Sequence, residues 1–140
     1  MSGSPESALP RKEIPVVDYL VLGAEPHLVG QRCVRCSAEY FGRRVACAAC
    51  FERTFTEFAV PRQGELVAFS IVHQAAPGVP VPYIAGCIDC GGTMVRANVV
   101  HVAPDPDALR LGTTMRLTTF SVGSDLTGTE AVAFGFEPVR

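Results

Sequence analysis

The chain has 140 residues, of which 48% are hydrophobic and 19% are charged, with a formal net charge of −2 at pH 7. This balance excludes a disordered chain, and no segment reaches about 18 unbroken apolar residues, which excludes a membrane-spanning helix. A chain of this length can bury about two-thirds of its unfolded surface, so we expect a soluble globular protein of one ordinary domain or two very small ones.

The first 15 residues are rich in Ser, Pro and charge and show no hydrophobic period. Such segments are typically mobile, and we expect residues 1–15 to form a flexible leader. No apolar run follows the charges, as a secretory signal would require, so we expect a cytoplasmic protein. Thiols stay reduced in that compartment, which favours metal or redox chemistry over disulfides for the six cysteines.

The next segment, PVVDYLVLG at residues 15–23, is apolar enough to be buried. It is too short and too rich in β-branched residues to be identified as a helix, and its structure stays open.

Two C-x2-C pairs follow, with ten residues between them: Cys33 with Cys36, and Cys47 with Cys50. Gly42 lies between short apolar segments of the insert, as a hairpin turn requires. Zinc prefers four tetrahedral ligands, and each C-x2-C turn directs two thiolates at one ion. We expect a structural Zn²⁺ in a ribbon over residues 16–60, because four cysteines leave no open position for water or substrate. Packed cysteines or a redox pair are the alternative.

The rest of the chain contains five apolar or alternating segments, each followed by Gly, Pro or Asp punctuation: 65–72, 83–89, 93–102, 114–122 and 130–139. A turn-like segment at 105–112 separates the third from the fourth. This count and spacing match a small Greek-key barrel. We predict a mainly β protein, with an N-terminal rubredoxin-like zinc ribbon followed by a five-stranded OB-fold barrel over residues 61–140. A five-stranded sandwich is the alternative.

A third C-x2-C pair, Cys87 and Cys90, falls in the second of these segments and the turn after it. No fourth pair exists to complete a second metal site. We interpret the two cysteines as a strand residue and a turn residue; a redox or metal role is the alternative.

The charges disfavour a nucleic-acid binder, although ribbons and OB-folds both occur in that class. Between residues 30 and 53 five arginines outnumber two acids, but four thiolates around one zinc ion contribute a net charge of −2. From Glu65 onward seven acids outnumber four arginines. Such a surface repels a phosphate backbone, so single-stranded nucleic-acid binding is a secondary alternative.

The sequence shows no convincing catalytic constellation of its own. His27, His73 and His101 are scattered; we place His73 at the end of one strand and His101 on another, where histidines are usually packed or at the surface. No nucleophile elbow, phosphate loop or persuasive carboxylate pair is present, although Cys87 as a lone nucleophile stays open. We predict a binding or scaffolding module with no catalytic residue.

Three segments carry a family resemblance: HLVGQRCVRCSAEYFGRRVACAAC, GELVAFSIVHQAAPGVPVPYIAG and DALRLGTTMRLTTF. Together they resemble the zinc-ribbon/OB-fold proteins, a family defined by a domain of unknown function and associated with acyl-CoA metabolism. The resemblance covers residues 16–139. The order of ribbon, barrel strand, Pro-rich loop and D-x-L-x-x-G turn is its most specific part.

The resemblance implies a non-catalytic accessory subunit of a thiolase-like complex that acts on acyl-CoA. The reaction would be carbon–carbon bond cleavage or formation, thiolysis, retro-aldol cleavage or acyl transfer. The small protein would pack on the thiolase dimer in a hetero-oligomer, stabilise it and shape the acyl-CoA entrance, while the partner supplies the catalytic residues. A free-standing acyl-CoA-binding protein is the alternative.

Carried onto this chain, the resemblance covers the four zinc ligands, the ribbon arginines and the loop from Pro77 to Tyr83. A guanidinium fork suits phosphate oxygens, so we expect CoA phosphates to meet some of these arginines. The candidates are Arg32, Arg35, Arg43 and Arg44. Solvation of the ribbon is the alternative role for them. Cys87 and Cys90 depart from the family pattern, which leaves their role open.

Overall fold

The computed structural model describes residues 13–42 and 44–139. Residues 1–12, which hold most of the expected leader, lie outside the described residues, as do Arg43 and Arg140. Apart from one short 3-10 helix, Pro106–Ala108, the described elements are strands. Within these ranges no helix is long and apolar enough to cross a membrane.

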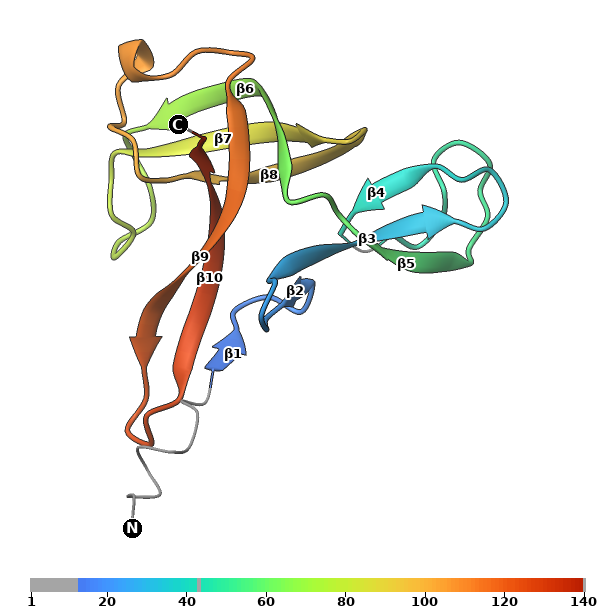
Figure 1. The fold of residues 1–140 in the computed structure, drawn as a ribbon, viewed down its shortest axis with the longest axis horizontal. Helices are drawn as coiled ribbons and strands as arrows, with labels where there is room; N and C mark the ends of the chain where they lie inside the picture. The colour runs from blue at the N-terminus through green and yellow to red at the C-terminus, as the bar shows by residue number, and fades with distance from the viewer. Residues whose placement is uncertain (1–12, 43, 140) are drawn as a thin grey trace.

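Five strands form a closed barrel: β6 (Gln63–Val72), β7 (Tyr83–Cys90), β8 (Thr93–Val99), β9 (Thr114–Ser124) and β10 (Glu130–Pro138). Neighbours around the ring run β6–β7–β8–β10–β9 and back to β6, and all pairs are antiparallel except β8 with β10 (Figure 1). The predicted five-stranded barrel is confirmed. The 3-10 helix falls in the predicted turn segment. Asp105 caps it and Pro106 is its first residue, which favours a helical turn at this place.

Alternation along the strands fills the barrel. In β7, Ile84, Gly86, Ile88 and Cys90 are buried, while the residues between them are partly exposed. Gly86 is required for close packing, since a Cβ there would lie 2.7 Å from a methyl carbon of Val99. The period of two therefore separates an inner face, which makes the core, from an outer face that is free to interact.

The ribbon is a second sheet built on the seven-residue strand β3 (His27–Cys33). Its partners are β2 (Leu20–Val21), β4 (Glu39–Phe41) and β5 (Phe55–Ala59), all antiparallel. The segment at residues 15–23, whose structure the sequence did not determine, contains a turn and the short strand β2 after its first residue. Gly30 lets the ring of Phe58 lie against the strand, because a Cβ at Gly30 would be 2.7 Å from that ring.

Strand β1 (Glu13–Pro15) corrects the expected extent of the leader. It pairs in parallel with Glu130–Val132 of β10, and the N–H of Val16 donates to the carbonyl of Val132 at 2.9 Å. Backbone pairing rather than burial holds β1, since all three of its residues are exposed. Composition therefore gave no signal for this strand.

Aromatic rings join the ribbon to the barrel. The ring of Tyr19 meets Phe41 edge-on at 4.7 Å between centroids and Phe134 of β10 at 5.9 Å. Because β2–β5 lie between β1 and β6 in the chain, the ribbon is attached to the barrel sheet at both of its ends (Figure 1).

Candidate metal centre and surface sites

The four predicted zinc ligands come together at the far end of the ribbon. Their Sγ atoms all lie within 4.8 Å of one another, with 3.5 Å from Cys33 to Cys50 and from Cys36 to Cys47. A tetrahedral ion with Zn–S bonds of about 2.3 Å places its sulfurs about 3.8 Å apart. The donor set and spacing therefore fit Zn²⁺, and a closed set of four thiolates gives the ion a structural role.

The two C-x2-C turns have the same backbone geometry. The N–H of Ser37 donates to the carbonyl of Cys33 at 3.0 Å, and the N–H of Phe51 donates to the carbonyl of Cys47 at 2.8 Å. Ser37 and Phe51 both have φ of 66°. This left-handed conformation costs a non-glycine residue about 1 kcal/mol, and it is uncommon for a side chain as large as Phe.

Hydrogen bonds to sulfur prepare the first cysteine of each turn for metal binding. The N–H groups of Arg35 and Ala49 lie 3.4 Å from the Sγ atoms of Cys33 and Cys47. The hydroxyl of Tyr40, 3.4 Å from the Cys47 sulfur, lowers the pKa of that thiol to about 6. The thiolate, which is the ligand form, is thus favoured at neutral pH.

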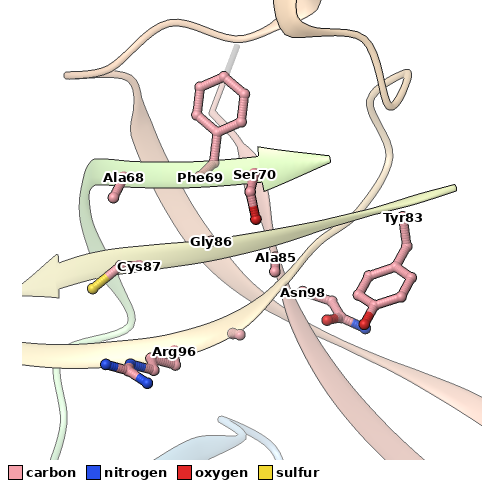
Figure 2. A pocket seen from close by; sticks show the side chains of 10 residues that line it. Ala68, Phe69, Ser70, Tyr83, Ala85, Gly86, Cys87, Arg96 and Asn98 are labelled. Atoms are coloured by element: carbon pink, nitrogen blue, oxygen red, sulfur yellow. The ribbon is translucent and has the colours of Figure 1, made fainter. Parts of the chain in front are cut away.

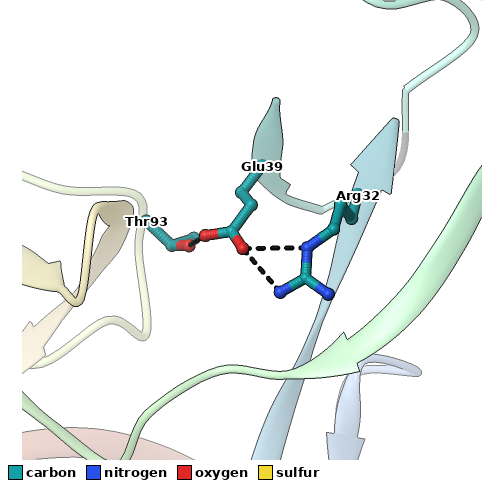
Figure 3. Close-up of polar contacts among 3 residues, drawn as sticks. All are labelled: Arg32, Glu39 and Thr93. Carbon is teal, nitrogen blue, oxygen red and sulfur yellow. Dashed lines mark hydrogen bonds and ion pairs between the residues drawn. The ribbon is translucent and has the colours of Figure 1, made fainter. Parts of the chain in front are cut away.

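Arg32 is engaged in a joint between the two sheets (Figure 3). Its Nε and Nη2 donate to Oε2 of Glu39 at 3.0 and 2.6 Å, and its guanidinium lies 4.5 Å from the centroid of the Phe58 ring. The hydroxyl of buried Thr93, on β8, donates to Oε1 of Glu39 at 3.1 Å. Arg32 and then Thr93 lower the pKa of Glu39. A CoA phosphate at Arg32 would have to compete with Glu39.

The remaining candidate arginines differ in their surroundings. Arg35 is exposed, and Arg43 lies outside the described residues. Arg44 stacks over the Tyr40 ring at 4.2 Å and donates from Nε to the carbonyl of Ala46 at 3.3 Å. It shares a depression of about 410 Å³ with Arg53, which sequence reasoning did not select. The CoA contacts stay a prediction. Among the described candidates, Arg44 lies in a depression beside a second arginine, Arg53.

Cys87 and Cys90 lie on opposite faces of β7. Cys90, expected in the turn, is the last residue of the strand, is fully buried, and has its pKa raised to about 11 by that burial. Cys87 is half-buried on the outer face, with its Sγ 3.9 Å from the sulfur of Met94. Residues three apart on a strand point in opposite directions, so the pair does not form a shared metal or redox site.

The expected strand position of His101 is wrong. Strand β8 ends at Val99, and His101 follows it in a bend with φ of 63°. Its Nδ1 contacts the carboxylate of Glu137, which also accepts a bond from Nε of Arg116 at 2.7 Å. The Nδ1 atom of His27 lies 3.2 Å from the backbone carbonyl of Glu25. Each of these two histidines has a local structural partner.

An open depression of about 650 Å³ lies on the outer face of β6, β7 and β8 (Figure 2). Sequence reasoning did not find it, because it depends on which residues stand side by side across three strands. The available signal was the run of small residues at outward positions, such as Ala68, Ser70 and Ala85. Its lining is formed by Ala68, Phe69, Ser70, Tyr83, Ala85, Gly86, Cys87, Arg96, Ala97 and Asn98.

Comparison with known families agrees with both halves of the fold. Residues 22–56 match the rubredoxin-like zinc ribbon domain of ChsH2, and residues 57–120 match the C-terminal OB-fold domain of ChsH2. The chain belongs to the ChsH2-type family of zinc-ribbon/OB-fold proteins. A solved structure described as an Ltp2–ChsH2 (DUF35) aldolase contains a chain of the same fold, with a TM-score of 0.62 and 22% identity. The alignment covers 80% of this chain and 84% of that one. A search of curated proteins found no match.

Proposed function

We propose that this chain is a non-catalytic accessory subunit of a thiolase-like enzyme complex that acts on acyl-CoA, making or breaking a carbon–carbon bond. The observation that carries the proposal is the similarity over ribbon and barrel together to a chain of an Ltp2–ChsH2 aldolase, which contains two different proteins. The family match to both ChsH2 domains supports the same role.

The metal centre supports a scaffolding role. A zinc ion with four thiolate ligands has no position for substrate, so it fixes the ribbon rather than performing chemistry. The joint through Glu39 then fixes the ribbon on the barrel. The two sheets would present a preformed surface to the enzyme.

Exposed apolar side chains on the ribbon support a protein contact there. Val34 is 50% exposed, Val45 83% and Phe51 81%, and all three lie on or between the two cysteine turns. Grouped exposed apolar residues commonly mark interaction sites. This end of the ribbon is therefore our candidate for the enzyme contact.

Co-expression with a thiolase-like enzyme encoded in the same host tests the proposal. We expect the tagged chain to retain that enzyme at a fixed ratio through size exclusion, and acyl-CoA cleavage or condensation to need both proteins. Cys47→Ala should abolish co-purification because the ribbon loses its metal. Ala48→Ser, an exposed change in the same turn, should preserve it.

Two outcomes contradict the proposal. A chain that stays monomeric with each thiolase-like candidate yet binds acyl-CoA would be a free-standing acyl-CoA-binding protein. Tight binding to a labelled single strand at physiological salt would indicate a nucleic-acid protein instead.

A further inference from the structure

The depression on β6, β7 and β8 has an ordered arrangement of side chains. Strand register places Ala68 opposite Cys87 and Cys87 opposite Arg96, which makes one row across three strands. A second row runs from Ser70 through Ala85 to Asn98. Small side chains in both rows keep the floor low, so a flat ligand can approach the sheet.

Polar and aromatic groups surround this floor. The side chains of Ser70, Tyr83, Arg96 and Asn98 all project from the same side of the sheet, whereas Phe69 points the other way (Figure 2). Within residues 13–42 and 44–139, none of these four polar side chains has a hydrogen bond or ion pair. They are therefore available to a ligand.

The aromatic and the charged side chains lie at different positions along the depression. Asn98 and Arg96 are two residues apart on β8, which separates their Cα atoms by about 7 Å. Tyr83 and Cys87 are four apart on β7, or about 13 Å, so the aromatic ring and the guanidinium belong to opposite ends. A ligand that fits has a flat ring at one end and negative charge at the other.

An adenine nucleotide has this arrangement. Its base stacks on an aromatic ring, its edge pairs with a side-chain amide, and its phosphates suit a guanidinium fork. A volume of about 650 Å³ is in the usual range for such ligands. We propose that the depression binds the adenine nucleotide part of acyl-CoA, with the base at Tyr83 and Asn98 and the phosphates at Arg96. The choice of CoA as the source of the nucleotide rests on the proposed function.

Two features favour a single nucleotide over larger ligands. The floor strand β7 pairs along its length with β6 on one side and β8 on the other, so an added peptide strand cannot pair with the floor of the depression. Among the lining residues, Arg96 is the single cation, and Tyr83 is the aromatic residue whose ring lies on the outer face. A polynucleotide needs several successive charges and stacking surfaces.

Cys87 provides a native reporter inside the depression. It is half-buried there, Cys90 is fully buried, and the other four cysteines are the candidate zinc ligands. The rate at which N-ethylmaleimide alkylates Cys87 in the zinc-loaded full chain can be followed by mass spectrometry. We expect saturating desulfo-CoA, which has no thiol, to slow this alkylation at least fivefold, and ADP to do the same.

Variants locate the bound groups. Arg96→Gln and Tyr83→Leu should each raise the half-protecting concentration of desulfo-CoA at least tenfold. Arg110→Gln, which removes an exposed arginine outside the depression, should leave it unchanged. Retained zinc content and an unchanged far-UV spectrum show that a variant is folded.

Several results would overturn the inference. These are no protection by desulfo-CoA, protection that Arg96→Gln does not weaken, protection by ADP but not by desulfo-CoA, or stronger protection by a single-stranded oligonucleotide. If the partner enzyme alone protects Cys87 and desulfo-CoA does not, the face is a protein interface, and the inference fails while the proposed function stands. Protection by desulfo-CoA in a chain that binds no thiolase-like enzyme would support the site and contradict the accessory role.

Discussion

The ribbon and the barrel are both small β-sheets, but different interactions hold them together. In the barrel, large apolar side chains such as Leu66, Ile88 and Phe136 are fully buried. Between residues 33 and 54, with Arg43 outside the described part, the buried residues are Cys33 and Cys47. At the other end of the ribbon, Leu20 and Leu28 are buried in the same cluster as the barrel core. The zinc end buries too little apolar surface by itself, so we expect metal binding to take the place of a core there.

Removal of one zinc ligand should produce the largest difference in stability between the two sheets. Structural zinc contributes about 10–16 kcal/mol of binding free energy in small domains. We expect Cys47→Ala to lose zinc and unfold the ribbon while the barrel keeps its strands. Zinc content and amide hydrogen exchange measure this. Stoichiometric zinc with unchanged melting would contradict the assignment of the metal site.

Loss of a core side chain should destabilise the barrel rather than the ribbon. Phe136 is 0% exposed at the centre of the barrel, and truncation of a buried Phe costs about 3–5 kcal/mol. We expect Phe136→Ala to lower the free energy of unfolding in urea by that amount, with zinc retained in the folded fraction. Val122→Ala, at a position 57% exposed, is the control and should change it little.

The joint at Glu39 allows a test of how much its carboxylate charge contributes to stability. Glu39→Gln weakens charge-assisted bonds to Arg32, and we expect a loss of about 1 kcal/mol at pH 7. The pKa of Glu39 lies below its ordinary value of 4.5, so its contribution is full above that pH. It should disappear as the pH falls through the folded-state pKa.

Urea unfolding in saturating zinc, from pH 7 downward, measures the difference between wild type and Glu39→Gln. This difference should shrink at acidic pH. Glu57→Gln, an exposed change on β5, is the control. A difference that stays constant with pH would show that the carboxylate charge contributes nothing at the joint.

The smallest expected effect is a gain within the ribbon. Phe51 is in the left-handed region, where glycine avoids the Cβ penalty, and its side chain is 81% exposed. Phe51→Gly should raise the stability of the zinc-loaded protein by about 0.5–1 kcal/mol in thermal unfolding. Phe51→Ala keeps the Cβ and should give no such gain, which makes it the matched control.

Local patterns were enough to predict much of this molecule. The alternation around Ile84 and Ile88 located a strand, and the spacing of the cysteines located the ribbon, because both signals lie within a few residues. Contacts between distant residues gave no such signal. Glu39 and Thr93 are 54 positions apart, and the outer depression depends on the register of Arg96 against Cys87. Strand β1 was missed because backbone groups alone hold it.

Strand β1 also determines how the metal-bearing sheet can move. The chain enters the barrel sheet at β1, leaves to build the ribbon, and returns at β6. Backbone hydrogen bonds anchor the ribbon at β1 and the chain itself anchors it at β6, so the ribbon cannot rotate freely about a single linker. A force applied at the zinc end would therefore act on both β10 and β6.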